Sequence, residues 1–363
     1  MLRCPSLLVC GLVVAGCATA PSTAQQDAPQ YLGQMRIAHG APFDGTVIGG
    51  LSGISYDVDS DLYYVISDDR SAHSSARFYT ARIRLSDNRI DGVDVVATYP
   101  LLDRGGQPFP PLDASARPPV VPPDPEGIAV DGARRLLYWS SEGERDGALV
   151  RDPSVRIATL DGSYVGEFVL PDMLRMTDGP TGPRQNRALE GLTLTPDGRH
   201  LWAAMEGPGH QDGALPTAEA GTLTRITRFD VETRTATAQY AYPLEKVRSG
   251  PRGDNGLTDL VALDEQNFLA VERGYGDRVQ AGVYRVSVGD AEDVLGRPSL
   301  QGPPPRTMTK TLLLGLPDAV DPIDNIEGIT LGPALPDGRR ALILVSDDNF
   351  APRQLTQIVA FAF

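Results

Sequence analysis

Leu189-Glu190-Gly191-Leu192 is one of five copies of a short phrase in this chain, each leading into β-forming residues. The other copies are Leu51-Ser52-Gly53-Ile54, Pro125-Glu126-Gly127-Ile128, Leu257-Thr258-Asp259-Leu260 and Ile326-Glu327-Gly328-Ile329. Aligned on Ser52, Glu126, Glu190, Asp259 and Glu327, successive copies are 74, 64, 69 and 68 residues apart. A β-type repeat of this length is typical of a radial array of small sheets, the β-propeller.

Each repeat continues with further β-forming runs that are separated by turn residues. In the second repeat the runs cover 127–130, 136–140, 155–160 and 165–170, with Asp131-Gly132 and Asp161-Gly162 as turns. Four strands make one propeller blade, but the last repeat has only three, and a lone strand is predicted from Tyr31 to Ala38. We therefore predict an all-β propeller of five blades, closed by the N-terminal strand pairing into the last blade. A sixth blade hidden in the connections 101–123, 206–221 or 289–305 is the alternative.

Composition fits a single globular domain over residues 31–363. The chain has 363 residues, of which 41% are hydrophobic and 22% charged, and its formal net charge is −14. This charge argues against nucleic acid as a partner, because a phosphate backbone would be repelled. We expect a monomer.

The first residues are predicted to be an export signal. An apolar run ends in Val14-Ala15-Gly16-Cys17, which resembles a bacterial lipobox, so residues 1–17 are predicted as a lipoprotein signal with Cys17 lipidated. The alternative is an ordinary secretory signal cut after Ala20. Residues 18–30 are then a flexible tether. This predicts a protein anchored by lipid in the bacterial cell envelope, at the outer membrane and facing the periplasm, with no other membrane contact.

Acidic residues are predicted to gather at one face of the propeller. The start of the first strand and the end of the antiparallel second strand of a blade lie at the same face, and both places carry acids. So many like charges need compensation by a hard cation or by arginines. Oxygen-only ligands favour Ca²⁺. The candidate metal ligands are Asp68, Glu126, Glu190, Asp259, Glu327, Asp347 and Asp348.

Arginines follow or precede these acids and are candidates to bind an anionic group, because a guanidinium pairs well with phosphate. They are Arg70, Arg145, Arg187, Arg273 and Arg353. Asp69 and Glu190 are the candidate catalytic carboxylates. The alternative is that the repeated acids hydrogen-bond backbone amides of adjacent blades and act only in packing.

Several phrases together resemble the phytase-like family, described by its esterase-like activity of phytase type. The resemblance covers about residues 50–349 and rests on Glu126-Gly127-Ile128-Ala129, 188–192, 254–259, 325–329, Ser67-Asp68-Asp69-Arg70 and Ser346-Asp347-Asp348-Asn349. It implies an exported bacterial propeller with phosphoesterase or esterase activity. The β-propeller phytases resemble the chain in architecture only, and a lysine-rich phosphate site is missing because Lys246 and Lys310 are its only lysines.

The leading functional hypothesis is a calcium-dependent hydrolase of a small anionic ester, either a phosphate or a carboxylic ester. One alternative is a non-enzymatic propeller that binds an envelope component through its loops, since fold does not fix function. Another is a sugar lactonase with a central calcium ion.

Overall fold

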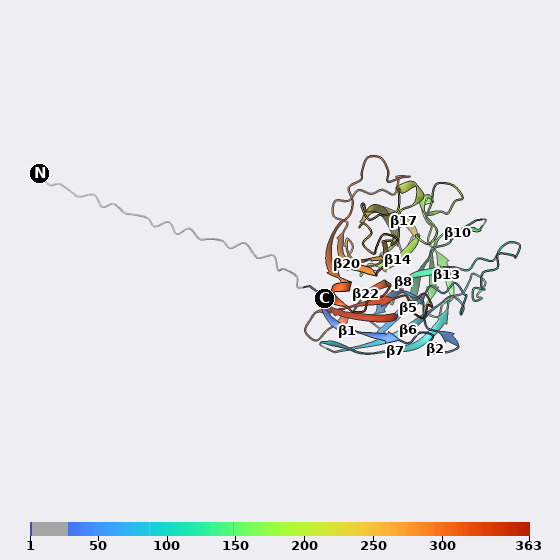
Figure 1. The fold of residues 1–363 in the computed structure, drawn as a ribbon, viewed down its shortest axis with the longest axis horizontal. Coiled ribbons are helices and arrows are strands. Elements are labelled where there is room, and N and C mark those ends of the chain that lie inside the picture. The colour runs from blue at the N-terminus through green and yellow to red at the C-terminus, as the bar shows by residue number, and fades with distance from the viewer. Residues whose placement is uncertain (2–27, 87, 148) are drawn as a thin grey trace.

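The computed structural model describes residues 1, 28–86, 88–147 and 149–363, and within them it shows a five-bladed β-propeller (Figure 1). Each blade is a four-stranded antiparallel sheet. Blade 1 contains β4 (Leu51–Asp57), β5 (Leu62–Ser67), β6 (Arg77–Ser86) and β7 (Arg89–Pro100). Blade 2 contains β8 (Pro125–Asp131), β9 (Leu136–Ser141), β12 (Ser154–Thr159) and β13 (Tyr164–Glu167).

The remaining blades follow in chain order. Blade 3 contains β14 (Leu189–Leu194), β15 (His200–Met205), β16 (Thr222–Asp230) and β17 (Thr235–Leu244). Blade 4 contains β18 (Gly256–Ala262), β19 (Asn267–Gly274), β20 (Gln280–Ser287) and β21 (Thr309–Gly315). Blade 5 contains β22 (Ile326–Ala334), β23 (Arg340–Ser346), β24 (Thr356–Ala362) and β1 (Gln30–Ile37).

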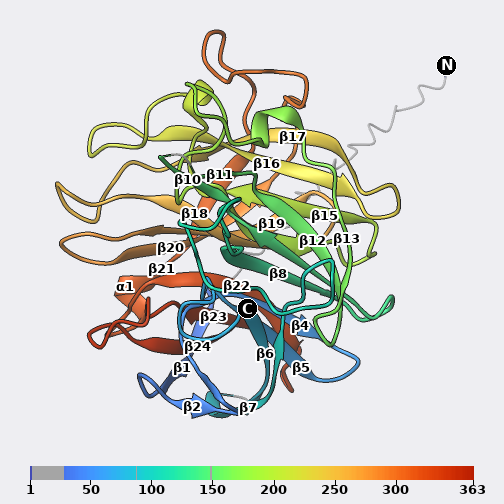
Figure 2. The same cartoon turned by 90° about the vertical axis from the view of Figure 1, so that its right-hand side faces the viewer.

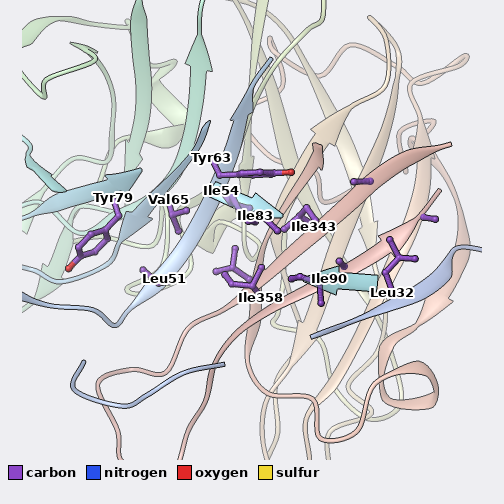
Figure 3. Close-up of a cluster of buried hydrophobic side chains, with 14 of the residues drawn as sticks. Leu32, Leu51, Ile54, Tyr63, Val65, Tyr79, Ile83, Ile90, Ile343 and Ile358 are labelled. Carbon is purple, nitrogen blue, oxygen red and sulfur yellow. The ribbon is translucent and has the colours of Figure 1, made fainter. Parts of the chain in front are cut away.

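The ring is closed by the two ends of the described chain, as predicted. β1 pairs antiparallel with β24, from Gln30 opposite Ala362 to Ile37 opposite Thr356, and the two strands lie side by side in Figure 2. A hydrophobic cluster joins this last blade to the first one; Figure 3 shows Ile343 near Ile83 and Ile54, and Leu32 near Ile90. Burial of these side chains removes an exposed sheet edge and ties the first and last blades together.

The long connections contain only short elements and no sixth blade among the described residues. They hold the hairpins β2–β3 (Pro42–Phe43, Thr46–Val47) and β10–β11 (Glu144–Asp146, Leu149–Arg151), the 3₁₀ turns η1 (Asp172–Leu174) and η2 (His210–Asp212), and the helix α1 (Leu316–Ala319). The five-blade prediction is therefore confirmed. Over the described part of the chain, no helix has the length and apolarity needed to cross a membrane. The predicted signal and most of the tether lie outside the described residues.

The first strands of the blades pack closely around the axis, which explains the glycine of the repeated phrase. A Cβ atom on Gly53 would lie 2.5 Å from the carbonyl oxygen of Glu126, and one on Gly127 would lie 2.3 Å from that of Glu190. Only glycine allows the backbones of neighbouring blades to approach this closely.

Candidate functional site: an acidic basin at one end of the propeller axis

The strand directions bring two positions of every blade to the same end of the axis. Each first strand starts at this end and the second strand, antiparallel to it, finishes there. In all five blades the pairing of these two strands is irregular at the second residue of the repeated phrase, and in blades 2 and 3 the irregularity includes the third residue as well. A bulge re-aims a side chain, and here it lies at the mouth of the channel.

Strand register defines two rings of equivalent residues at this mouth. The inner ring is the second residue of each phrase, and the outer ring is the residue that follows the strand partner of the phrase's first residue. In blade order the inner ring is Ser52, Glu126, Glu190, Thr258 and Glu327, and the outer ring is Asp68, Glu142, Glu206, Arg273 and Asp347.

Between the rings lies a basin with a cavity volume of about 290 Å³. Nearly all of its thirteen lining residues are charged or carry a side-chain amide, and seven carboxylates face two arginines. The lining therefore has five negative charges in excess when all groups are ionised. The lining residues are Asp68, Arg70, Asp124, Glu126, Asn186, Glu190, Asp254, Arg273, Tyr275, Asn325, Glu327, Asp347 and Asn349.

Arginines neutralise only part of this charge. Arg273 is buried and bonds Glu327 at 2.6 Å, with Glu206 at 3.7 Å and Asp254 at 3.8 Å. Although burial opposes it, these carboxylates raise the pKa of Arg273, which keeps the guanidinium charged. Arg187 contacts Glu206 at 2.7 Å and Asp254 at 2.6 Å.

Five carboxylates in or beside the basin, all but Asp68 buried, have no arginine or lysine within 4 Å among the described residues. They include Glu126 and Glu190, whose pKa values are raised well above the ordinary range, first by burial and then by neighbouring carboxylates. Burial also raises the pKa of Asp68, and Asp347 beside it adds to the shift. Groups of this kind bind a proton or a cation readily. The five are Asp68, Glu126, Glu142, Glu190 and Asp347.

The acids of blades 2 and 3 come close enough together to ligate a metal ion. One oxygen from each of Asp124, Glu126 and Glu142 lies within 4.8 Å of the other two, and the same holds for Glu142, Glu190 and Glu206. Carboxylate oxygens are the ligands that hard divalent cations such as Ca²⁺ prefer. The donor set therefore fits such a cation.

The two aspartate pairs that were predicted to be functional each divide between two environments. Asp68 and Asp347 line the basin, whereas the next residue in each pair turns away from it. Asp69 accepts hydrogen bonds from Arg77 at 2.7 Å and from the backbone N–H groups of residues 72, 73 and 74. Asp348 accepts from the backbone N–H groups of Gly50 and Phe350. Their carboxylates hold loops and do not reach the basin, so the roles expected for Asp69 and Asp348 do not fit their positions.

The fourth repeat was aligned one residue out of register, and the prediction for Asp259 is wrong for this reason. Asp259 pairs with Val271 as Gly53 pairs with Ile66, so Thr258 is the residue equivalent to the glutamates. The Asp259 carboxylate accepts hydrogen bonds from the backbone N–H groups of Leu192, Leu260 and Ile329. It therefore connects blades 3, 4 and 5 at the axis, which is the packing role considered as the alternative.

The predicted arginines also separate into two groups. Arg70 and Arg273 line the basin, and Arg187 contacts Glu206 behind its wall. Arg145 instead donates to the carbonyl oxygens of Thr181 and Pro183 in a loop. Arg353 is exposed and lies outside the lining.

Several residues in or beside the basin were not among the candidates, including Glu142, Glu206, Asp124 and Asn325. Glu142 and Glu206 end second strands, and register alone would have included them. Asp124 lies two residues before a first-strand glutamate, outside the repeated phrase, and burial with the nearby Glu144 raises its pKa to about 7 although Arg70 opposes the shift. Asn325 donates to Glu327 at 2.9 Å; it directly precedes the fifth phrase, which is the only sequence signal for it.

A second cavity, of about 430 Å³, lies at the opposite end of the axis, where the first strands finish. Its buried acids have local partners: Asp131 pairs with Arg134 at 2.8 Å, and Asp57 accepts a hydrogen bond from Ser60 at 2.6 Å. The opposite cavity is larger, but its lining holds four carboxylates against two arginines, a smaller excess of negative charge than in the basin.

Comparison with known proteins identifies the family. The model of the Phytase-like family, described as "Esterase-like activity of phytase", matches residues 46–350. The chain belongs to this family. The match covers the basin residues of all five blades. No match was found among curated protein sequences.

The solved structures that this chain resembles have little sequence in common with it. The structure resembles a GH43 β-1,3-galactosidase with 10% identity and a TM-score of 0.44, covering 90% of this chain and 94% of the other. A hypothetical protein from Leishmania major has 12% identity, a TM-score of 0.43 and coverages of 94% and 92%. The periplasmic gluconolactonase of Pseudomonas aeruginosa has 12% identity, a TM-score of 0.36 and coverages of 88% and 90%. Similarity at this level assigns no activity.

Proposed function

We propose that this member of the Phytase-like family is a calcium-dependent hydrolase of phosphate or carboxylic esters, with the acidic basin as its active site. The observation that carries the proposal is the set of five carboxylates in or beside the basin, four of them buried, that have no cationic partner in the described residues. Buried charges are stable only when they are paired, protonated or bound to a metal. A bound divalent cation would neutralise these carboxylates and would supply Lewis acidity in the basin.

The residues of blades 2 and 3 would hold the cation. Glu142 of the outer ring belongs to both groups of close carboxylates. Glu126 and Glu190 of the inner ring each belong to one of them. A bound Ca²⁺ supplies Lewis acidity, which polarises an ester oxygen and lowers the pKa of a bound water. Asp124 and Glu206 complete the wall and are held in place by arginines 70 and 187.

Residues of blades 1 and 5 would accept the proton, and Arg70 would bind the anionic group. Asp68 and Asp347 have no arginine or lysine partner within the described structure. Burial raises the pKa values of both, and the charge of Asp347 adds to the shift at Asp68 as that of Glu327 adds to the shift at Asp347. Asp68 is therefore placed to accept a proton from an attacking water, the role first expected of Asp69. Arg70, with a side chain 30% exposed, lies at the lining and can turn toward an anionic substrate group.

Two measurements on the purified protein test this function. Thermal unfolding in Ca²⁺ and in chelator should differ by mass action, by about 2.7 kcal/mol at a free concentration one hundred times the Kd. Turnover should be measured on a panel of phosphate esters, acyl esters and sugar lactones, with Glu190→Gln as the inactive control. Hydrolysis of lactones alone would favour the lactonase alternative. Calcium binding without turnover on any substrate would reject the hydrolase and favour a binding module.

We also propose that lipid on Cys17 anchors the protein in the cell envelope. The support comes from the sequence and from the position of β1, which starts opposite Ala362 at the end of the propeller away from the basin. An anchor before residue 28 would then leave the basin facing away from the membrane. Cys17→Ser should move the protein from the membrane fraction to the soluble periplasmic fraction, and unchanged fractionation would exclude the anchor.

A further inference from the structure

The two groups of close carboxylates in blades 2 and 3 share Glu142, and each group has the span of one cation site. Oxygens that bind the same Ca²⁺ at about 2.4 Å lie no more than about 5 Å apart. The three oxygens of each group lie within 4.8 Å of one another. One group draws on Asp124 and Glu126, and the other on Glu190 and Glu206, so each has its own ligands as well as the shared one.

Unpartnered side chains point independently to ligands at both positions. Glu126 and Glu190 are only 8% and 7% exposed, and both line the basin. Neither carboxylate has a hydrogen-bond or ion-pair partner among the described residues, and leaving such a group buried is costly. One of these side chains belongs to each group, so a single ion in either group would leave the other carboxylate unsatisfied.

The charge of the basin also indicates two ions. When all its groups are ionised, the lining carries five negative charges in excess of its arginines. One divalent cation would leave three, which would still repel an anionic ester, whereas two would leave one. A second divalent ion would therefore favour the binding of an anionic group beside Arg70.

We propose that the basin binds two divalent cations bridged by Glu142, the first with Asp124 and Glu126 and the second with Glu190 and Glu206. The identity of the ions as Ca²⁺ rests on the proposed function. Such a pair would clamp two oxygens of one substrate group, as two-metal hydrolases do.

The two positions differ in affinity because arginines compete for their ligands unequally. Glu206 already contacts Arg187 at 2.7 Å and Arg273 at 3.7 Å. Asp124 has one arginine, Arg70, at 3.6 Å. The position built on Asp124 and Glu126 therefore binds the tighter ion and fills first.

Titration of the chelator-treated full chain with Ca²⁺, followed by calorimetry and by direct metal analysis after dialysis, tests the proposal without any substrate. The wild type should bind two ions in two resolved steps. Glu126→Gln should lose the tighter step and Glu190→Gln the weaker one, whereas Glu142→Gln should weaken both at least tenfold. Asp348→Asn is the matched control, a buried aspartate at the same end of blade 5 that faces away from the basin, and it should keep both steps.

The outcomes separate this proposal from the proposed function. A stoichiometry of one in the wild type, or loss of the same step in Glu126→Gln and Glu190→Gln, overturns the bridged pair even if the enzyme turns over esters. Two ions without turnover supports the pair and rejects the hydrolase. Circular dichroism of each variant in chelator establishes that a lost step is not a lost fold, and a variant that fails to fold is replaced by Glu126→Ala or Glu190→Ala at the same position.

Discussion

Blades 2 and 3 differ from blade 4 at the two positions that form the basin. Blades 2 and 3 each bring a glutamate to the inner ring and another to the outer ring, whereas blade 4 brings Thr258 and Arg273. Blade 4 also has two acids in this region, Asp259 and Glu272, but each lies one residue away from the ring position. Because neighbouring residues of a strand point to opposite sides, this shift turns both acids away and directs a cation inward.

The basin therefore has two different walls. The wall formed by blades 2 and 3 has an excess of carboxylates, and the wall formed by blade 4 supplies a guanidinium. The acids of blades 2 and 3 lack sufficient positive partners, while Arg273 neutralises Glu327 of blade 5. The displaced acids of blade 4 are used in the structure. Glu272 accepts hydrogen bonds from Tyr242 at 2.8 Å and from Asn255 at 2.8 Å, and Asp259 binds backbone amides at the axis.

Removal of the internal cation should have the largest effect. Arg273→Met leaves Glu327 buried without its arginine, so we expect a loss of about 3–5 kcal/mol in the free energy of unfolding, the cost of breaking a buried ion pair. Urea denaturation at fixed Ca²⁺ measures it. The exposed Arg353→Met is the control and should change stability by less than about 0.5 kcal/mol. A similarly small loss in Arg273→Met would show that Arg273 does not balance the basin.

Asp259→Ala should have the next largest effect and should identify a structural carboxylate. Three backbone N–H groups lose their acceptor at the axis, and we expect a loss of about 2–3 kcal/mol because buried donors are left unsatisfied. The calcium-induced rise in melting temperature should persist, because Asp259 does not line the basin. Loss of the calcium response in this variant would return Asp259 to the metal ligands.

These two residues show how far the sequence could predict the site. Period and turn pattern were sufficient for the five blades and the closing strand, because both follow from local β-propensity and from counting strands. Glu126, Glu190 and Glu327 were also predictable, since the phrase itself places them at strand starts. Aligning acid with acid failed at Asp259, because strand pairing and not residue type decides which side chain faces the axis.

Other features of the basin depend on contacts that no local pattern contains. Asp68 and Asp69 are adjacent and chemically identical, yet only the first lines the basin, because the turn after β5 directs the second toward Arg77. Asp124 lies outside the repeated phrase, and the long loop that precedes β8 places it at the basin. Arg273 was expected to hold substrate, but it is occupied by carboxylates from three blades, which only the closed ring brings together.

Glu190→Gln should change stability in opposite directions with and without calcium. In chelator the substitution removes a buried charge that neighbouring glutamates repel, so the free energy of unfolding should rise by about 2 kcal/mol, the scale of one close repulsion at intermediate dielectric. In saturating Ca²⁺ the same variant should be less stable than the wild type because it has lost a ligand. Denaturation curves under both conditions measure the reversal. Destabilisation by the same amount in both conditions would assign Glu190 to packing.

A pH dependence of stability should distinguish the acids of blades 2 and 3 from blade 4. Burial raises the pKa of Asp124 to about 7, against about 4 in an unfolded chain, so between these values the folded state holds a proton that the unfolded state has lost. Stability in chelator should therefore fall as pH rises through this window, by up to about 1.4 kcal/mol per pH unit for each such group.

Substitutions in the two walls should alter this slope differently. Asp124→Asn should reduce it, whereas Thr258→Val in blade 4 should leave it unchanged because it removes no titrating group. Saturating Ca²⁺ should remove or reverse the slope, since the cation binds the deprotonated carboxylates. Melting temperatures from pH 5 to 8 are sufficient for the comparison. An equal slope in Asp124→Asn and the wild type would mean that Asp124 titrates normally and that the wall formed by blades 2 and 3 carries less uncompensated charge than its geometry indicates.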